Sequence, residues 1–456
     1  MPPHDAIESL HSPSARLLIW AIGLLLLLVI GRELRRVPAR LLVLMASAFL
    51  DMVGLFLVLP LLPFYVQRFA GDGFELPWFG TIGIGSLSGL LASAFTVAQM
   101  LSAPLWGRLS DRVGRRPVLM IAVTASAVAF GILAVADSLW LLLLSRVVQG
   151  AGGGTVGVIQ AYVADTVAPL QRTRALGWLS ASTNLGVALG PALSSVLVSL
   201  GDADLMPGAG VLHLGRGVAP GLGAALLCLI NLLFVAVVLR ESRVPGAAPR
   251  TTPPVSTRTA AWQAITRIRE PAPRLLWIYG IAIGAFQGIG PVLPFFLQGR
   301  LGFDEGSIGY VFMYIGAISV LARVVLLGRL VDRLGEVRLA QIGITTLAAG
   351  LLGLSFVGSL GHLALAVALL PLGTSFTFPC VSALLSRAVH GDDRGLYLGL
   401  QQTFGSASRL CAPLLYGWAY DALGAAAPFQ FAAALVLSSM ALALGLPRRS
   451  DSPATG

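Results

Sequence analysis

Long apolar segments alternate with short polar connections along almost the whole chain. About 20 consecutive apolar residues let a helix cross a bilayer, and in lipid only helices or closed barrels satisfy the backbone hydrogen bonds. The pattern therefore predicts twelve membrane-spanning helices in two groups of six. They are expected at residues 41–65, 83–106, 117–136, 138–163, 174–200, 218–240, 274–298, 306–328, 338–358, 361–386, 395–420 and 425–447.

One long polar connection separates the two groups. Residues 241–273 contain PGAAPRTTPPVSTR, and Pro, Thr and Arg at this density do not form a packed core. We expect a flexible cytoplasmic linker here. It joins an N-terminal six-helix bundle at 39–240 to a C-terminal six-helix bundle at 274–447, and residues 448–456 form a cytoplasmic tail.

The N-terminal extension, residues 1–38, contains a further apolar run, LLIWAIGLLLLLVIG, at 17–31. We favour an extra hydrophobic helix. The same apolar run is also compatible with an uncleaved signal-anchor, or with a start codon placed upstream of the true one. A removed signal peptide is disfavoured, because no small-x-small cleavage site follows the run.

Composition and charge agree with a membrane protein. Hydrophobic residues make up 56% of the chain and charged residues 11%, whereas soluble domains carry about a quarter charged residues.

The chain has no Lys, and 24 of its 31 Arg lie in alternate connections on one side. The opposite side of the core holds Arg68, Arg216 and Arg300. Because basic loops stay in the cytoplasm, both ends of the twelve-helix core should face the cytoplasm. We expect a multi-pass protein of the inner (plasma) membrane. This placement of charge argues against nucleic acid as the partner.

Short motifs recur once in each half. Gly107, Asp111 and Gly114 match Gly328, Asp332 and Gly335 at an offset of 221 residues. Arg172, Gly177 and Pro191 match Arg394, Gly399 and Pro413 at an offset of 222 residues. PLLPFY at 60–65 is answered by PVLPFF at 291–296. Landmarks in the same order, on the same side of each group, predict a duplicated six-helix bundle.

This arrangement resembles the major facilitator superfamily over about residues 39–447. The segment GRLSDRVGRRPVL, from Gly107, is similar to that family's loop between its second and third helices. The resemblance implies two bundles related by a pseudo-two-fold axis along the membrane normal, which rock around a central substrate site.

The same loop suggests a conformational latch. Gly107 and Gly114 permit tight turns, and Asp111 is able to accept hydrogen bonds from a facing helix N-terminus. Candidate cations are Arg112, Arg115 and Arg116, and the resemblance also points to Asp165 as their partner. Asp332 and Arg333 belong to the second copy of the loop. The alternative is that these arginines only fix the loop in the cytoplasm, and both interpretations are compatible.

The predicted fifth span contains a spaced set of small residues. Gly177, Gly186, Gly190 and Pro191 resemble the motif of proton-coupled exporters in the superfamily, although Ala-Leu-Ser-Ser follows in place of a glycine pair. Small residues and a Pro kink favour a bendable, close-packed helix where the bundles meet. Generic helix packing would explain the same glycines.

Asp51, in the predicted first span, is the acid placed deepest in the core. Arg146, in RVVQGAGGG, fits the family pattern for the fourth helix, and an Arg in hydrocarbon should face a cavity or a partner. We expect Asp51 and Arg146 to couple transport to protons. The alternative is a permanent ion pair between them that only holds helices together. The glycines after Gln149 lie in a predicted helix, where they favour close packing over a dinucleotide site.

Other polar and aromatic side chains within predicted spans are candidates for the substrate cavity. Arg323 and Arg409 are expected either to bind an anionic group or to snorkel and bond carbonyls. The remaining candidates, each of which packing would also explain, are Gln99, Gln160, Asn184, Asn231, Phe286, Gln287, Tyr314, Gln401, Gln402 and Phe404.

The motifs together look most like twelve-helix drug:proton antiporters near the bacterial tetracycline exporters. We therefore expect a monomeric transporter that exports small amphipathic organic compounds in exchange for protons. Those exporters also use an acid in the ninth helix and a His in the eighth, which 338–358 and 306–328 lack, so tetracycline itself is not expected.

Three other classes of function differ from this expectation. A facilitator or importer of a small metabolite, such as an anionic one, is the first alternative, and a transport-dead receptor is the second. An enzyme is disfavoured, because HExxH, CxxC, GxSxG and phosphate-loop motifs do not occur. No cofactor or metal is expected, since the five His are scattered.

Overall fold

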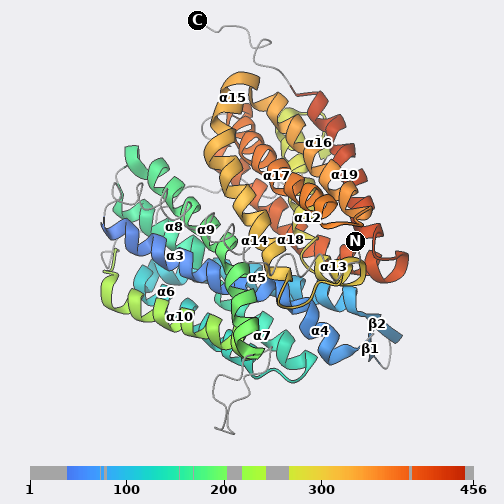
Figure 1. The fold of residues 1–456 in the computed structure, drawn as a ribbon. Coiled ribbons are helices and arrows are strands. Elements are labelled where there is room, and N and C mark those ends of the chain that lie inside the picture. The colour runs from blue at the N-terminus through green and yellow to red at the C-terminus, as the bar shows by residue number, and fades with distance from the viewer. Residues whose placement is uncertain are drawn as a thin grey trace, which may run out of the picture. The chain divides into compact units, whose positions relative to one another are not determined.

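A computed structural model of the chain describes residues 39–71, 73–76, 80–153, 155–167, 169–202, 218–242, 266–389 and 393–446. This part of the chain is built almost entirely of helices (Figure 1). Ten of its helices are long and apolar enough to cross a membrane. The prediction of an all-α membrane protein is therefore confirmed. The predicted extra helix at 17–31 and most of the predicted linker lie outside the described residues.

Each of the twelve predicted spans contains helix. In the first half the elements are α3 (Ala39–Val58), η1 (Leu59–Leu61), α4 (Leu62–Ala70), α5 (Ile84–Val113), α6 (Arg115–Ala134), α7 (Leu139–Gly152), α8 (Thr155–Thr166), α9 (Pro169–Asp202) and α10 (Val218–Val238). In the second half they are α12 (Pro271–Gln287), α13 (Leu293–Leu301), α14 (Ile308–Leu321), η2 (Ala322–Leu327), α15 (Gly328–Leu334), α16 (Glu336–Ser355), α17 (Leu360–Ala388), α18 (Arg394–Leu423) and α19 (Ala427–Leu444).

Two predicted spans are not among the ten long apolar helices. α12 is only 17 residues long, because the helix ends before Gly288 and resumes as α13 at Leu293. α18 is 30 residues long but carries Gln401, Gln402 and Arg409, which lower its apolar character. Both helices are nonetheless present where the pattern predicted them.

A glycine run interrupts the predicted fourth span. α7 ends at Gly152 and α8 begins at Thr155, so Gly150 and Gly152 lie in a helix as expected, whereas Gly153 lies in a turn. Gly lacks a Cβ and weakens a helix, which favours a break at this run. The break frees the Gly153 carbonyl, which accepts a 3.0 Å hydrogen bond from Nε2 of Gln99.

A two-stranded hairpin was not predicted. β1 (Gly73–Leu76) pairs with β2 (Gly80–Gly83) in antiparallel register, with Gly73 opposite Gly83. It lies between α4 and α5 (Figure 1). The four-residue strands are too short to give a clear alternation of polar and apolar positions.

The sequence repeat is visible in the backbone at two equivalent turns. Gly114 separates α5 from α6 with a φ of +112°, and Gly335 separates α15 from α16 with a φ of +77°. Residues with a Cβ rarely adopt such angles, which explains why glycine stands at both turns.

The chain folds into two compact units. Unit 1 comprises Met1–Tyr65, Val97–Ala248 and Leu297–Met313, and unit 2 comprises Val66–Thr96, Pro249–Phe296 and Tyr314–Gly456. Unit 2 includes Val66–Thr96, which precede the predicted linker, and unit 1 includes Leu297–Met313, which follow it, so that α5 is divided near Thr96.

Within unit 1, α3 is packed against α8, α9 and α10. Its buried side chains include Leu44 and Ala48, which join a core containing Ile159, Leu179 and Val235. If residue 186 carried a Cβ atom in place of glycine, that atom would lie 2.6 Å from the carbonyl oxygen of Phe49. A Cβ atom at position 190 would likewise lie 2.8 Å from the carbonyl oxygen of Val53. The two glycines of the fifth predicted span thus let α9 approach the α3 backbone closely, which fixes the register of Asp51.

Candidate functional site

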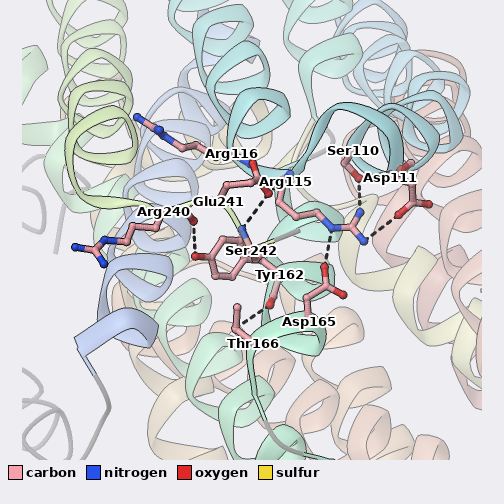
Figure 2. A network of polar contacts seen from close by, with 11 residues as sticks. Ser110, Asp111, Arg115, Arg116, Tyr162, Asp165, Thr166, Arg240, Glu241 and Ser242 are labelled. Atoms are coloured by element: carbon pink, nitrogen blue, oxygen red, sulfur yellow. Dashed lines mark hydrogen bonds and ion pairs between the residues drawn. The ribbon is translucent and has the colours of Figure 1, made fainter. Parts of the chain in front are cut away.

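Arg115 is the centre of a polar network at the start of α6 (Figure 2). Its Nε donates to Oδ2 of Asp165 at 3.0 Å, and Nη2 pairs with Oδ1 of Asp111 at 2.9 Å. Nη1 donates to Oγ of Ser110 at 2.6 Å. The Arg115 side chain is only 8% exposed, so these contacts compensate the charge of a buried guanidinium. The structure thus pairs the loop with Asp165, whereas Arg112 is exposed.

Glu241, just after α10, closes the other side of the network (Figure 2). Its carboxylate accepts hydrogen bonds from the backbone amides of Arg115 and Arg116 at 2.8 and 3.0 Å. It therefore satisfies the first free amides of α6 and interacts favourably with the helix dipole. A Cβ on Gly114 would lie 2.5 Å from Glu241 Oε2, so the glycine also makes room for the carboxylate.

Two more bonds attach the end of α10 to this network. Tyr162 of α8 donates its hydroxyl proton to the carbonyl oxygen of Arg240 at 2.6 Å. Nη2 of Arg116 donates to the carbonyl oxygen of Ala236. The end of α10 is thus held to α6 and α8, and Glu241, the first residue of the predicted linker, is held to α6.

The second copy of the loop is built differently. Asp332 and Arg333, the candidates from the repeat, are both exposed. The ion pair here joins Nη1 of Arg387, at the end of α17, to Oε2 of Glu336, the first residue of α16, at 2.7 Å. α16 begins two residues before its predicted span, so the ninth span does contain an acid, but at its first turn.

Asp51 lies about 18 Å along α3 from Ala39, at 1.5 Å per residue. Oδ2 accepts a hydrogen bond of 2.7 Å from the hydroxyl of Thr155, the first residue of α8. The break between α7 and α8 is what places this hydroxyl at the carboxylate. Asp51 is partly exposed, and this bond holds one of its carboxylate oxygens in position.

Arg146 does not form an ion pair with Asp51 among the described residues. Its side chain is 1% exposed on α7, and Nη2 donates to the hydroxyl oxygen of Ser145 at 3.0 Å. The guanidinium carbon lies 6.0 Å from the centre of the Phe130 ring, within cation–π range. Phe130 also packs near Gly54, which lies one turn beyond Asp51 on α3. Arg146 and Asp51 therefore lie near the same part of unit 1 without contacting each other.

The remaining members of the fifth-span motif have different neighbours. Gly177 has open space where a Cβ would be. The Pro191 carbonyl and the Ser195 hydroxyl lie against Gly309, near the start of α14. Small residues therefore serve close packing along α9 on two sides, at α3 and at α14. Gly107 lies inside α5, so the expectation that it permits a tight turn is wrong, and a Cβ there would have open space.

The N-terminus of α5 is capped by a residue far away in sequence. The carboxylate of Asp421, in α18, accepts hydrogen bonds from the amides of Gly85 and Ser86 at 3.0 and 2.8 Å. Gly417, one turn earlier, lies directly against the carbonyl of Gly85. A Cβ on Gly89 would meet the carbonyl of Pro413. α5 and α18 thus approach backbone to backbone within unit 2, which the repeat did not predict.

Several cavity candidates make packing bonds within their units. Asn231, buried on α10, donates Nδ2 to the Ser47 carbonyl at 3.3 Å. Asn184 donates to the Ser180 carbonyl of its own helix at 2.6 Å. Nε2 of Gln401 donates to the Ser382 hydroxyl at 2.9 Å.

The other candidates fall into two groups. Phe404 stacks edge-to-face on Trp277, and Phe286 is partly buried. The exposed candidates are Gln160, Gln287, Tyr314 and Gln402. Arg323, in η2, and Arg409, in α18, are partly buried in unit 2. Tyr279 of α12 and Arg409 both lie beside Gly405.

Comparison with known proteins decides the family. Residues 44–370 and 275–456 match the family described as Major Facilitator Superfamily. The chain belongs to this superfamily of membrane transporters. The resemblance seen in the Gly107 loop and in the repeat is thereby confirmed.

Curated relatives cover most of the chain. Tetracycline resistance protein class D of Salmonella ordonez is 26% identical over 82% of this chain and 87% of its own length. Class C of Escherichia coli is 29% identical over 84% and 90%. The human major facilitator superfamily domain-containing protein 10 is 27% identical over 83% and 87%.

Solved structures agree on the fold. The crystal structure of the human organic anion transporter MFSD10 (TETRAN) has a TM-score of 0.61 and 24% identity, covering 89% of this chain and all of that one. A bacterial homologue of the human lysosomal transporter Spinster, inward-facing and occupied, has a TM-score of 0.68 and 15% identity, covering 89% and 95%.

Sequence reasoning missed three functional-site candidates. Thr155 follows a glycine run that was interpreted as continuous helix. Glu241 stands 126 residues from Arg115, and only its position directly after an apolar span hinted at a role. Asp421 carried no signal beyond being an acid at a span end.

Proposed function

We infer that this protein is a secondary active transporter that exports small amphipathic organic compounds in exchange for protons. Asp51 is the proton-carrying group, and the two halves expose it alternately to the two sides of the membrane. Membership of a transporter superfamily supports the general activity, and relatives named for tetracycline resistance support the direction of transport. The plasma membrane, with cytoplasmic ends of the core, is the proposed location.

The observation that carries the proton-coupling role is the position of Asp51. It is a carboxylate in the interior of a long apolar helix, where an acid is costly and expected to be functional. Among the described residues Arg146 does not pair with Asp51, so this cation does not hold the carboxylate in its charged form. Thr155 orients one oxygen and leaves the other for a proton.

The test uses everted membrane vesicles from cells that lack other exporters. A resistance screen in such cells supplies the substrate. Adding that substrate to vesicles with an imposed proton gradient should release protons with the wild-type protein and not with Asp51→Asn. Asp137→Asn, at an exposed loop, is the matched control and should behave as the wild type. Proton release that persists in Asp51→Asn contradicts the proposal.

A second candidate function is a facilitator or importer of an anionic metabolite. Arg323 and Arg409, two cations within spans of unit 2, favour it. In the same vesicles a facilitator equilibrates substrate whether or not a proton gradient is present, and a receptor shows no flux at all.

A further inference from the structure

Three side chains of α5 donate hydrogen bonds to backbone carbonyl groups where α7 ends. The three bonds run from Nε2 of Gln99 to Gly153 at 3.0 Å, from Oγ of Ser102 to Gly150 at 3.4 Å, and from Nε1 of Trp106 to Ala151. The donors are spaced by three and four residues, which places them on one face of α5. Between positions 101 and 108, Ser102 and Trp106 are partly buried and every other residue is exposed. This face of α5 is therefore the one that contacts α7.

These carbonyl groups are ones that a continuous helix would use for its own hydrogen bonds. In an α-helix each carbonyl accepts from the backbone amide four residues later, and the last four carbonyls of a helix lack such a partner. Because α7 ends at Gly152 and α8 begins at Thr155, side chains of α5 take the place of those amides. The three bonds therefore stabilise the break between α7 and α8 and compete with its closure.

Gly153 provides the space that the Gln99 amide needs. Its φ is −70° and its ψ is 23°, which residues with a side chain also adopt, so the backbone conformation does not require glycine. A Cβ at this position would lie 2.8 Å from Nε2 of Gln99. Glycine is thus suited to this position because it lets the donor reach the carbonyl.

The break determines where the hydroxyl of Thr155 lies. This hydroxyl contacts Oδ2 of Asp51 at 2.7 Å from the first residue of α8. If the break closed, helical residues would be added between α7 and α8, and each one turns a helix by about 100°. The hydroxyl would then be carried away from the carboxylate, because its direction from the helix axis would change.

We propose that Gln99, Ser102 and Trp106 are positioning residues for proton exchange at Asp51. They act through the backbone, since they hold the break between α7 and α8, and the break holds the hydroxyl of Thr155 on the carboxylate. The proposal rests on the inferred transport function, in which Asp51 carries the proton. It adds that α5, which does not itself contact the carboxylate in any described bond, controls this group.

The same helix takes part in the polar network at the start of α6. Asp111, about one and a half turns after Trp106 on α5, pairs with Arg115 at 2.9 Å. A displacement of α5 along α7 would therefore act on this ion pair and on the three hydrogen bonds together. The shared helix links the state of the network to the position of Thr155.

The test measures how the reaction of Asp51 with dicyclohexylcarbodiimide depends on pH. This hydrophobic reagent modifies protonated carboxyl groups, and mass spectrometry of the full-length protein in detergent gives the rate at Asp51. Thr155→Val should shift the midpoint of the pH profile by at least about half a pH unit, as expected for the loss of one hydrogen bond. Gln99→Leu should shift it in the same direction by a comparable amount. Arg146 and Cys228, ionisable groups near this part of α3, are the same in every variant.

A double variant separates positioning from a general effect on the fold. Thr155→Val combined with Gln99→Leu should behave like Thr155→Val alone, because the two substitutions interrupt one chain of contacts. Hydrogen exchange supplies a second readout. The backbone amides in the first turn of α8 should exchange more slowly in Gln99→Leu than in the wild type, since a continuous helix gives them acceptors.

Gln341→Leu is the matched control in unit 2. Nε2 of Gln341 also donates to a carbonyl in the last turn of a helix, that of Ala443 in α19, at 3.0 Å. This variant loses the same kind of bond and should leave the Asp51 profile unchanged. If Gln99→Leu does not fold, as judged by its melting temperature, Trp106→Phe and Ser102→Ala remove the neighbouring donors and should shift the profile in the same direction.

The outcomes distinguish this proposal from the transport function. An unchanged profile in Thr155→Val or in the α5 variants, additive shifts in the double variant, or unchanged exchange at the start of α8 would overturn the positioning role. Proton release that persists in Asp51→Asn in everted vesicles would instead contradict the transport function. The labelling and exchange results do not depend on transport, so either idea is able to fail alone.

Discussion

Glu336 and Arg387 form an ion pair of 2.7 Å in the second half that mirrors one in the first half with the charges exchanged. Arg115 and Asp165 are the equivalent positions, at the repeat offsets of 221 and 222 residues. The cation begins the third helix of the first half, whereas the anion begins the third helix of the second. The duplicated fold therefore retains the contact but not its polarity.

This exchange predicts that the polarity of the first pair can be reversed. Arg115→Glu and Asp165→Arg should each destabilise the protein by about 1–3 kcal/mol, because each leaves like charges in contact at a buried position. The double exchange should recover part of that loss. Recovery will be incomplete, since Asp111 also binds Arg115. Melting temperatures in detergent measure the effect, and a double variant no better than the worse single one would contradict it.

The second pair should matter much less for stability. The Arg387 side chain is 62% exposed, and exposed ion pairs contribute about 0–1 kcal/mol. Arg387→Gln should therefore lower the melting temperature less than Arg115→Gln does. Raising the salt concentration should shrink the small effect of Arg387→Gln further. Equal losses in the two variants would show that exposure does not set the difference.

Thr155 is predicted to support transport through its hydroxyl. Thr155→Val keeps the shape of the side chain but removes the donor to Asp51, and should slow substrate-driven proton release several-fold. Thr155→Ser keeps the donor and should retain most of the rate. The comparison is made in everted vesicles at equal protein amounts. Equal rates in the Val and Ser variants would mean that the hydrogen bond has no part in coupling.

Glu241 is predicted to stabilise the start of α6. Glu241→Ala removes the acceptor of two backbone amides at a helix N-terminus and should cost about 1–2 kcal/mol. Gly114→Ala should also destabilise, since it combines a positive φ with a close approach to the same carboxylate. Asp137→Ala, which removes an exposed loop carboxylate, serves as the control in the same melting experiment.

The contact between α5 and α18 gives a further prediction. Gly417→Ala would place a methyl group against the carbonyl of Gly85, which is backbone and cannot rotate away. We expect the variant to lower transport and to make the amide of Ser86 exchange faster with solvent. Asp421→Asn, which keeps the size but weakens the cap, should have the smaller effect. Unchanged exchange at Ser86 in both variants would contradict the prediction.

Hydropathy alone predicted where the helices lie, since lipid requires long apolar segments wherever the chain crosses it. It did not predict where they break. Gly153 ends a helix because its carbonyl finds Gln99, a partner on another helix. Likewise, Asp51 was expected beside Arg146, but the rotation of α3 and α8 about their axes brings Thr155 to it. Contacts between helices depend on such rotations, which a single sequence does not encode locally.

The division of α5 has a consequence for how the chain could be cut. Val66–Thr96 belong to unit 2, although they precede the predicted linker, and Leu297–Met313 belong to unit 1, although they follow it. If the chain were cut in the linker, each fragment would lack a segment that belongs to its own compact unit. Fragments expressed together should therefore reassemble, because each supplies what the other lacks, whereas either one alone should be degraded.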